Sequence, residues 1–229
     1  PPTTPRSSSA ASDVYKRQGT WMLLIVSAAL ICRRRWPERR ELSRKIVHIG
    51  TGPVIVLAWW LEVPASIAVP AALGVTVITA VNHRLQLLPA VEDVDRNSYG
   101  TVAYGLAISV LLILFWPDQA IAVCAGVLVM AFGDGLAGLV GRGVNSPSWS
   151  IWQQRKSTAG TLTMGLVSAL VLLVLLLTSQ SVIHPLRLIA VSALAVGLEQ
   201  LSRWGLDNLS VPVAAVSYTH LRAHETKRN

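Results

Sequence analysis

The sequence predicts an all-α fold, a polytopic bundle of transmembrane helices. The 229-residue chain is 52% hydrophobic and only 14% charged, with a mean hydropathy of +0.50. Soluble domains carry about 25% charged residues, and a single domain of this size cannot bury so much apolar surface. The apolar residues also occur in long runs, with the charges clustered between them. These features exclude a disordered chain, a coiled coil, a disulfide scaffold and a typical soluble enzyme.

The apolar runs predict the individual helices. A bilayer requires about 17–25 residues per spanning helix, and β-barrel alternation is absent, so helix is the spanning element. We expect about seven spans, with the last one truncated. The runs cover residues 20–32, 46–63, 64–82, 100–116, 120–141, 159–178 and 185–201, and an eighth begins at residue 208 and is cut off.

The two ends of the chain differ in character from the part between them. Residues 1–18 and 216–229 resemble translated sequencing-adapter read-through, so we expect the native integral membrane domain to cover residues 19–215. The chain has a net charge of +8, and each end segment contributes +2, which leaves +4 for residues 19–215. The first run is too short for a full span. We therefore expect the natural protein to extend beyond both ends.

Basic residues occupy alternate loops. The loops at 33–45, 82–99, 142–158 and 202–207 together hold thirteen Lys and Arg residues, whereas the short turns between them hold one. By the positive-inside rule, the basic loops face the cytoplasm. We expect a multi-pass integral membrane protein with its polar chemistry concentrated at the cytoplasmic surface.

Three acidic residues lie in or beside apolar runs. Asp134 lies inside the fifth run, Glu199 lies near the end of the seventh, and Asp207 opens the eighth. A carboxylate in a membrane helix costs about 3 kcal/mol on insertion scales, which makes each acid a candidate catalytic residue. A structural polar contact between helices is the alternative for each.

The segment GDGLAGLVGR surrounds the first of these acids. Gly133, Ala137 and Gly141 recur at four-residue spacing, which predicts a small-residue face for close helix packing. Packing alone does not explain Asp134 between two glycines, or Arg142 at the cytoplasmic end. A carboxylate flanked by glycine can be approached closely by a metal–phosphate group.

A basic, hydroxyl-rich segment precedes the sixth run. A helix N-terminus attracts anions through its free N–H groups and its dipole, and the lysine adds positive charge. No G-x-x-x-x-G precedes this lysine, so the segment is not a Walker A loop. An N-cap beside a topology-setting lysine is the simpler alternative. The candidate phosphate-binding residues here are Lys156, Ser157, Thr158 and Thr161.

Two further polar segments lie at the same predicted surface. Arg44, Lys45 and His48 start the second run, where a topology signal with an interfacial histidine is the favoured interpretation of these residues alone. Asp95 and Asn97 precede the fourth run and supply either oxygen ligands for Mg²⁺ or a helix cap. Together the segments offer metal ligands, cations and a proton acceptor. Phosphoryl transfer needs little more, because its catalysis is mostly positioning and charge neutralisation.

The order of these motifs resembles the polyprenol kinase family, which includes phytol, farnesol and dolichol kinases. The resemblance is greatest to small bacterial or plastid-type phytol kinases and extends over residues 44–212. The matching blocks are RKxxHxxxG at 44–52, a block that begins NSYGT at residue 97, GDGLAGLxGR at 133–142, KSTAGT at 156–161 and E…GxDNLSVP at 199–212.

The resemblance implies an integral membrane kinase that phosphorylates a prenyl alcohol, with CTP or in some members UTP as the donor and Mg²⁺ as the divalent metal. It adds Arg44, Lys45, His48, Gly160 and Asn208 to the candidate nucleotide site. Within this site we infer that Asp134 and Asp207 serve the metal or act as the base, and that Lys156 with Arg142 serves the phosphates. The implied partners are the prenyl alcohol, the nucleoside triphosphate and the bilayer, with no nucleic acid, and the oligomeric state stays open. The isoprenoid tail would lie between helices, open to lipid.

Other functions explain parts of the pattern. A CTP-dependent diacylglycerol kinase or a cytidylyltransferase would share the nucleotide and the membrane but take a different acceptor. A transporter with a broken helix at 133–141 would require an inverted internal repeat, which the two halves do not show. A structural membrane protein would leave the clustered acids unexplained.

Overall fold

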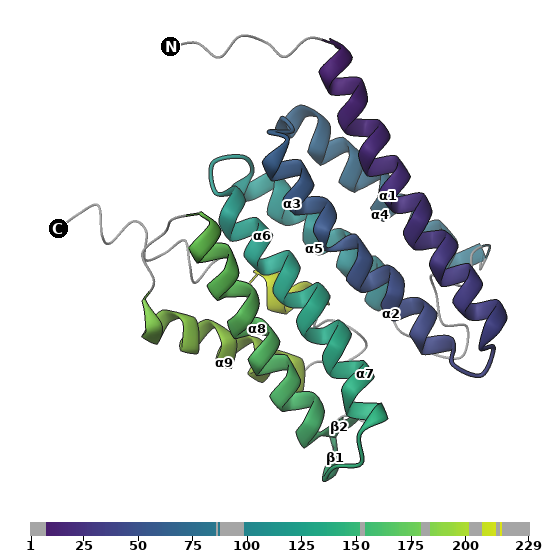
Figure 1. The fold of residues 1–229 in the computed structure, drawn as a ribbon, viewed down its shortest axis with the longest axis vertical. Helices are drawn as coiled ribbons and strands as arrows, with labels where there is room; N and C mark the ends of the chain where they lie inside the picture. The colour runs from purple at the N-terminus through teal and green to yellow at the C-terminus, as the bar shows by residue number, and fades with distance from the viewer. Residues whose placement is uncertain are drawn as a thin grey trace.

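The computed structural model describes residues 8–85, 87, 99–151, 154–179, 184–201, 208–213 and 216, and this part of the chain is almost entirely helical. Figure 1 shows the helices side by side, which confirms the predicted all-α class. In chain order the elements are α1 (Ser8–Arg35), α2 (Arg40–Thr51), α3 (Pro53–Trp60), α4 (Ala65–Leu85), α5 (Gly100–Phe115), α6 (Ala120–Leu128), η1 (Val129–Asp134), α7 (Gly135–Gly143), β1 (Ser148–Ile151), β2 (Gln154–Ser157), α8 (Thr158–Thr178) and α9 (Pro185–Leu201).

Four of the predicted runs match single helices closely. The runs at 64–82, 100–116, 159–178 and 185–201 correspond to α4, α5, α8 and α9, with boundaries that differ by no more than three residues. The residues at the helix starts explain this agreement. A proline opens α9, where its missing N–H costs nothing, and a serine side chain caps α8.

The first two runs differ from the prediction. The run at 20–32 lies within the much longer α1, which begins at Ser8, in the segment that the sequence sets apart as adapter-like. The run at 46–63 is two consecutive helices, α2 and α3, and the first begins earlier, at Arg40. Pro53 explains the interruption, because it has no N–H to continue the hydrogen-bond ladder. The Gly52 N–H bonds to Ile49 O at 3.2 Å, so the turn is tightened at this point.

The fifth run is the most unusual helix of the fold. It continues from α6 through a π-helical turn, η1, into α7, so residues Ala120–Gly143 form one apolar rod. A π-turn adds one residue to a helical turn and occurs frequently at functional sites. Here it ends at Asp134. The composition of the run gives no sign of it, and the sequence analysis missed it.

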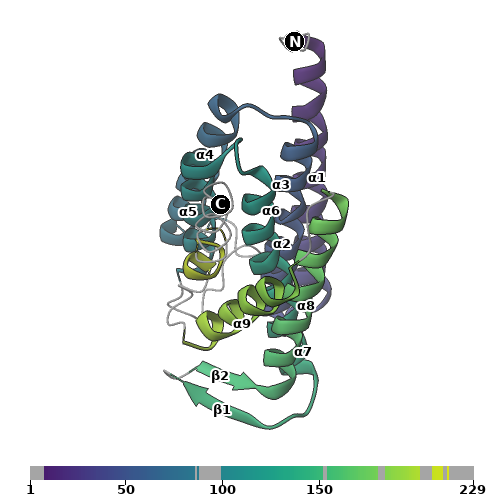
Figure 2. The same cartoon turned by 90° about the vertical axis from the view of Figure 1, so that its left-hand side faces the viewer.

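The predicted loop at 142–158 contains a β-hairpin. Strands β1 and β2 pair antiparallel, with Trp149 opposite Lys156 and Ser150 opposite Arg155. Figure 2 shows the hairpin at one end of the bundle, below α7 and α9. Because β2 leads directly into α8, the hairpin fixes Lys156 at the base of that helix.

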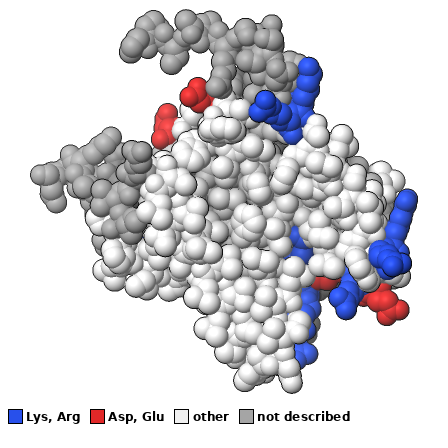
Figure 3. All heavy atoms as spheres, viewed as in Figure 1, with Lys and Arg blue, Asp and Glu red and all other residues white. Residues whose placement is uncertain are grey.

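Three helices within the described residues are long and apolar enough to cross a membrane: α4, the rod Ala120–Gly143, and α8. The shorter α5 is also apolar. Of the approximately seven spans expected from the sequence, the structure therefore supports three directly. On the face drawn in Figure 3, charged side chains gather at two ends and a broad uncharged band separates them. This distribution is typical of a membrane-associated protein.

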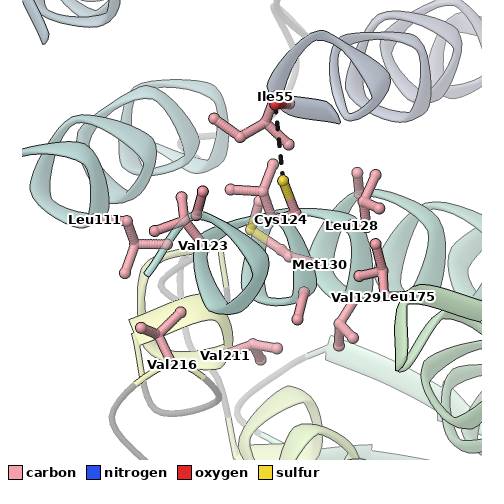
Figure 4. Close-up of a cluster of buried hydrophobic side chains, with 14 of the residues drawn as sticks. Ile55, Leu111, Val123, Cys124, Leu128, Val129, Met130, Leu175, Val211 and Val216 are labelled. Carbon is pink, nitrogen blue, oxygen red and sulfur yellow. Dashed lines mark hydrogen bonds between the residues drawn. The ribbon is translucent and has the colours of Figure 1, made fainter. Parts of the chain in front are cut away.

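The rod that carries Asp134 lies at the centre of the bundle. Figure 4 shows Val123, Cys124 and Val129 of this rod surrounded by side chains of α3, α5, α8 and the C-terminal residues. In its most apolar window 67% of the residues are buried, compared with 11% for α4. The apolar side chains of α4 lie mostly at the outside of the bundle, whereas neighbouring helices pack against the central rod on several sides. The core therefore fixes the position of Asp134.

The predicted small-residue face packs against α8. A Cβ atom added to Gly133 would lie 2.7 Å from Met164 Sδ, and one added to Gly141 would lie 2.8 Å from Ser157 Oγ and 3.3 Å from Gly160 Cα. These separations leave no room for a side chain. The small residues thus allow α7 and α8 to approach closely, as the four-residue spacing predicts.

We expect Gly141→Ala to lower the free energy of unfolding by about 1–3 kcal/mol, because the added methyl group pushes α7 away from the backbone of α8. Gly143→Ala is the matched control, since a Cβ atom there meets nothing within 4 Å. The measurement is the thermal unfolding midpoint of both variants in detergent. Equal midpoints would contradict the close packing of these two helices.

Candidate active site

A polar pocket of about 700 Å³ opens where α2, α7, the hairpin, the start of α8 and the end of α9 meet. All of these segments belong to the end of the bundle where α1 ends and the hairpin lies (Figure 1). The pocket collects residues that are far apart in the chain. Ten residues predicted from the sequence line it: Arg44, Lys45, Asp134, Arg142, Lys156, Ser157, Gly160, Thr161, Glu199 and Asn208.

The remaining predicted residues fall into two groups. His48 lies behind the pocket wall and contacts Asp134, whereas Thr158 donates a hydrogen bond from Oγ1 to Pro147 O at 3.2 Å, outside the lining. Asp95, Asn97 and Asp207 lie outside the described residues. Of the predicted metal ligands, only Asp134 is therefore placed.

One wall of the pocket is built around Asp134. Lys45 Nζ lies 2.6 Å from Asp134 Oδ2 and also donates to Asp134 O at 3.1 Å. His48 Nε2 lies 3.4 Å from the same Oδ2 and 3.4 Å from Met130 O, in the π-turn. The side chains of Lys45 and His48 are buried, and that of Asp134 is 15% exposed. Two polar groups from α2 thus hold one carboxylate oxygen at the edge of the pocket.

Glycines bring α2 close enough for these contacts. A Cβ atom on Gly135 would overlap Ile49 Cγ1, and one on Gly138 would lie 3.0 Å from Lys45 Cε. The sequence analysis offered helix packing as an explanation of the glycines, and noted that a carboxylate flanked by glycine can be approached closely by a metal–phosphate group. The structure fills the space next to Gly133 with α8 and the space next to Gly135 with α2. Helix packing accounts for both glycines.

The facing wall is built around Lys156 and Glu199. Lys156 Nζ lies 2.5 Å from Glu199 Oε1 and donates to Glu199 O at 2.7 Å. Gln200 Nε2 donates to Glu199 Oε2 at 2.8 Å and to Thr161 Oγ1 at 2.9 Å. Only about a tenth of the Lys156 and Glu199 side chains is exposed, 9% and 10%. This network ties α9 to the hairpin and to the first turn of α8.

The start of α8 is capped by the protein itself. The N–H groups of Thr158, Ala159 and Gly160 donate to Pro147 O, Ser146 Oγ and Ser157 Oγ, respectively. These three N–H groups are therefore not free, and anion binding at this helix end stays a prediction. Ser157 is the N-cap, as in the simpler alternative. The helix dipole and the neighbouring lysine are what this end offers to an anion.

Glu41 is a pocket residue that the sequence analysis missed. Its Oε1 accepts from Arg44 Nη2 at 2.6 Å and lies 2.8 Å from Arg142 Nη2. Burial by itself would raise the pKa of Glu41, but the charge and hydrogen bond of Arg44, with the charges of Arg142 and Lys45, lower it to about 2. The signal in the sequence that could have identified Glu41 is its position as an acid within the strongly basic loop at 33–45. Glu41 joins the first basic loop to the end of α7.

Among the described residues, few side chains could bind a divalent metal. They contain no group of three or more His, Cys, Asp or Glu side chains that could hold an ion. Mg²⁺ is often bound by one or two carboxylates together with substrate phosphates, so a preformed cage is not required. Lys45 and His48 both approach Oδ2 of Asp134, and within the described part of the chain Oδ1 has no hydrogen-bond partner. Asp134 fits the role of a single protein ligand to a nucleotide-bound metal.

Comparison with known proteins places the chain in a family. A phytol kinase from Synechocystis sp. is 40% identical over 199 residues, which cover 86% of this chain and 85% of that protein. This chain belongs to the polyprenol kinase family. Phytol kinase 1 of Arabidopsis thaliana, a chloroplastic protein, is 28% identical over 205 residues, covering 80% of this chain and 67% of the relative. Membership makes the chain a phosphotransferase.

A more distant relative agrees with this assignment. The chloroplastic farnesol kinase of Arabidopsis thaliana is 28% identical over 140 residues, which cover 55% of this chain and 44% of that protein. No protein-family model and no solved structure matches the chain.

Proposed function

We propose that this chain is a membrane-embedded kinase that transfers the γ-phosphoryl group of CTP to the hydroxyl of a prenyl alcohol such as phytol. One observation carries the proposal. Asp134, an acid inside an apolar helix, lines a pocket whose lining contains five basic and three acidic residues. An excess of cations suits a triphosphate, and the carboxylate suits a hydroxyl group or a metal. The names of the relatives support the prenyl alcohol as acceptor.

The two walls of the pocket divide the chemistry between them. Lys156 and Arg142 attract the phosphates and neutralise the charge that builds up during transfer. Lys45 and His48 hold Asp134 in one orientation, so that its carboxylate receives the hydrogen bond of the attacking hydroxyl. Mg²⁺, when bound with the nucleotide, would neutralise further phosphate charge. Asn208 lies on the pocket wall, and its Nδ2 donates to Gly100 O at 2.9 Å, which holds this residue at the start of α5.

The membrane places the reaction at one surface. The basic last turn of α1, Arg142 at the end of α7 and the hairpin belong to the same end of the bundle as the pocket. Under the positive-inside rule this end faces the cytoplasm, where nucleotides are available. The chain is then a multi-pass protein whose acceptor arrives through the lipid and whose donor arrives from water.

Phosphoryl transfer in membranes that contain the full chain tests this function. The membranes receive CTP labelled in the γ-phosphate, Mg²⁺ and phytol, and the organic phase is examined for labelled phytyl phosphate. Parallel samples offer farnesol or diacylglycerol as acceptor, and UTP or ATP as donor. We expect label in the prenyl phosphate. Label with diacylglycerol alone would move the function to a diacylglycerol kinase, and no label in any lipid from folded protein would overturn the proposal.

A further inference from the structure

A second depression lies on the other side of α2 from the polar pocket. It is an apolar groove of about 400 Å³, bounded by α1, α2 and α7. Trp21 and Ala28 of α1, Ile46 and Ile49 of α2, and Leu139 of α7 contribute to its lining, which contains no charged residue. The catalytic scheme above does not use this groove.

The groove and the polar pocket share α2 and α7 as a common wall. Lys45 and His48 of α2 reach Asp134, and the residue next to His48, Ile49, lines the groove. On the α7 side the wall is thin at Gly135, directly after Asp134, because a Cβ atom there would overlap Ile49 Cγ1. The side chain of Ile49 therefore lies against the backbone that carries the reactive carboxylate.

Specific contacts hold α1 beside α2 and keep the groove open to lipid. A Cβ atom on Gly50 would lie 2.8 Å from Ile25 Cδ1, so the glycine allows the two helices to touch. Trp21 Nε1 donates to Gly50 O at 2.9 Å and anchors one end of the groove. Leu24, which also lines it, is 61% exposed, so this side of the groove faces the surroundings of the bundle.

We propose that this groove between α1, α2 and α7 holds the isoprenoid chain of the acceptor, with the hydroxyl end at the α2–α7 wall, where the side chain of Ile49 has to move off Gly135 before the hydroxyl reaches Asp134. The inference rests on the proposed function. A prenyl alcohol has one polar end and a long apolar chain, and placing that chain among charged groups would forfeit the free energy of burying it in an apolar environment. The acceptor therefore requires an apolar site that adjoins the polar pocket, and the groove meets both conditions.

The groove positions the acceptor more than it raises affinity. The chain leaves one apolar environment, the bilayer, for another, so little hydrophobic free energy is gained on entry. The benefit lies in holding the hydroxyl in line with the phosphate, where a misplacement of about 1 Å can cost 100-fold in rate. The groove should therefore influence long acceptors and leave short ones almost unaffected.

Ala28→Trp fills the groove from an exposed position of α1, and Leu23→Trp, on the same helix but outside the lining, is the matched control. We expect Ala28→Trp to lower kcat/KM for phytol about 10- to 100-fold, with the KM for CTP unchanged. The five-carbon alcohol 3-methylbut-2-en-1-ol, which has no chain to place in the groove, should react at the same rate in both variants. Phosphorylation of phytol at equal rates by both variants would contradict the proposal that the groove binds the isoprenoid chain.

Photolabelling tests the groove without requiring turnover. A diazirine-bearing prenyl alcohol is irradiated with membranes of the unsubstituted chain, and the labelled peptides are mapped. We expect label on α1 and α2 that excess phytol removes and added phospholipid does not. Label that phospholipid removes equally well, or label spread over α4 and α8, would assign the groove to bulk lipid. Failure of every acceptor in the kinase assay would instead refute the proposed function. The photolabelling would still show whether the groove binds a prenyl alcohol.

Discussion

Asp134→Asn is expected to lower kcat for prenyl alcohol phosphorylation about 10²- to 10⁴-fold, the range for loss of a positioned acid–base group. Asparagine has nearly the same shape as aspartate, so the α7 backbone and the neighbouring glycines need not move. It lacks the negative charge that Lys45 Nζ meets at 2.6 Å, and it neither accepts a proton nor holds a divalent cation well. The measurement is the initial rate of labelled phosphate transfer from CTP to phytol.

The control for this variant has to separate chemistry from stability. Removing one partner of a buried ion pair destabilises a protein by about 3–5 kcal/mol, so Asp134→Asn also needs a thermal unfolding measurement in detergent. Asp118→Asn makes the same chemical change in an exposed turn and should leave the rate unchanged. A rate for Asp134→Asn within about threefold of the Asp118→Asn rate would exclude Asp134 from the reaction.

The metal dependence distinguishes the two roles open to Asp134. If the carboxylate holds the nucleotide-bound metal, the residual activity of Asp134→Asn should need more Mg²⁺ to saturate than that of the unsubstituted chain. If the carboxylate only receives the hydroxyl proton, the Mg²⁺ requirement should stay the same and kcat alone should fall.

The helices were predictable because long apolar runs leave few alternatives in a membrane. The alternation of basic loops also predicted which end would collect the polar residues, and this is why residues as distant as Lys45, Asp134 and Lys156 were assigned to one site. Two local features left no comparable signal. The π-turn before Asp134 adds a single residue to an apolar helix, and the strands beside Lys156 are only four residues long.

The partners of the acids could not be predicted from the sequence. Asp134 pairs with a lysine 89 positions away, and Glu199 with one 43 positions away. Nothing in the spacing of the motifs specifies which cation meets which acid, because that depends on how α2 packs on α7 and how α9 packs on α8. The sequence identified both acids as candidates but left a structural contact open for each. The geometry shows an ion pair in both cases, so variants must distinguish structure from catalysis.

Lys156→Met has two expected effects, of which only one reports on the reaction. It removes the cation from Glu199, whose side chain is 10% exposed, and this should lower the free energy of unfolding by about 3–5 kcal/mol. It also removes a positive charge from the pocket, which should lower kcat/KM about 10²- to 10³-fold if Lys156 neutralises the transferred phosphoryl group. Activity loss in this variant alone therefore does not distinguish a phosphate-binding lysine from a structural one.

The double variant Lys156→Met/Glu199→Gln separates the two effects. Glutamine in place of Glu199 needs no counter-ion and can keep a hydrogen bond with Gln200, so the unfolding midpoint should return most of the way to that of the unsubstituted chain. The rate should stay as low as in Lys156→Met, because neither substitution restores a cation for the phosphates. Recovery of the rate together with stability would show that Lys156 serves only to neutralise Glu199. A low rate in a stable protein would assign Lys156 to the nucleotide and make its pairing with Glu199 a contact that the triphosphate displaces.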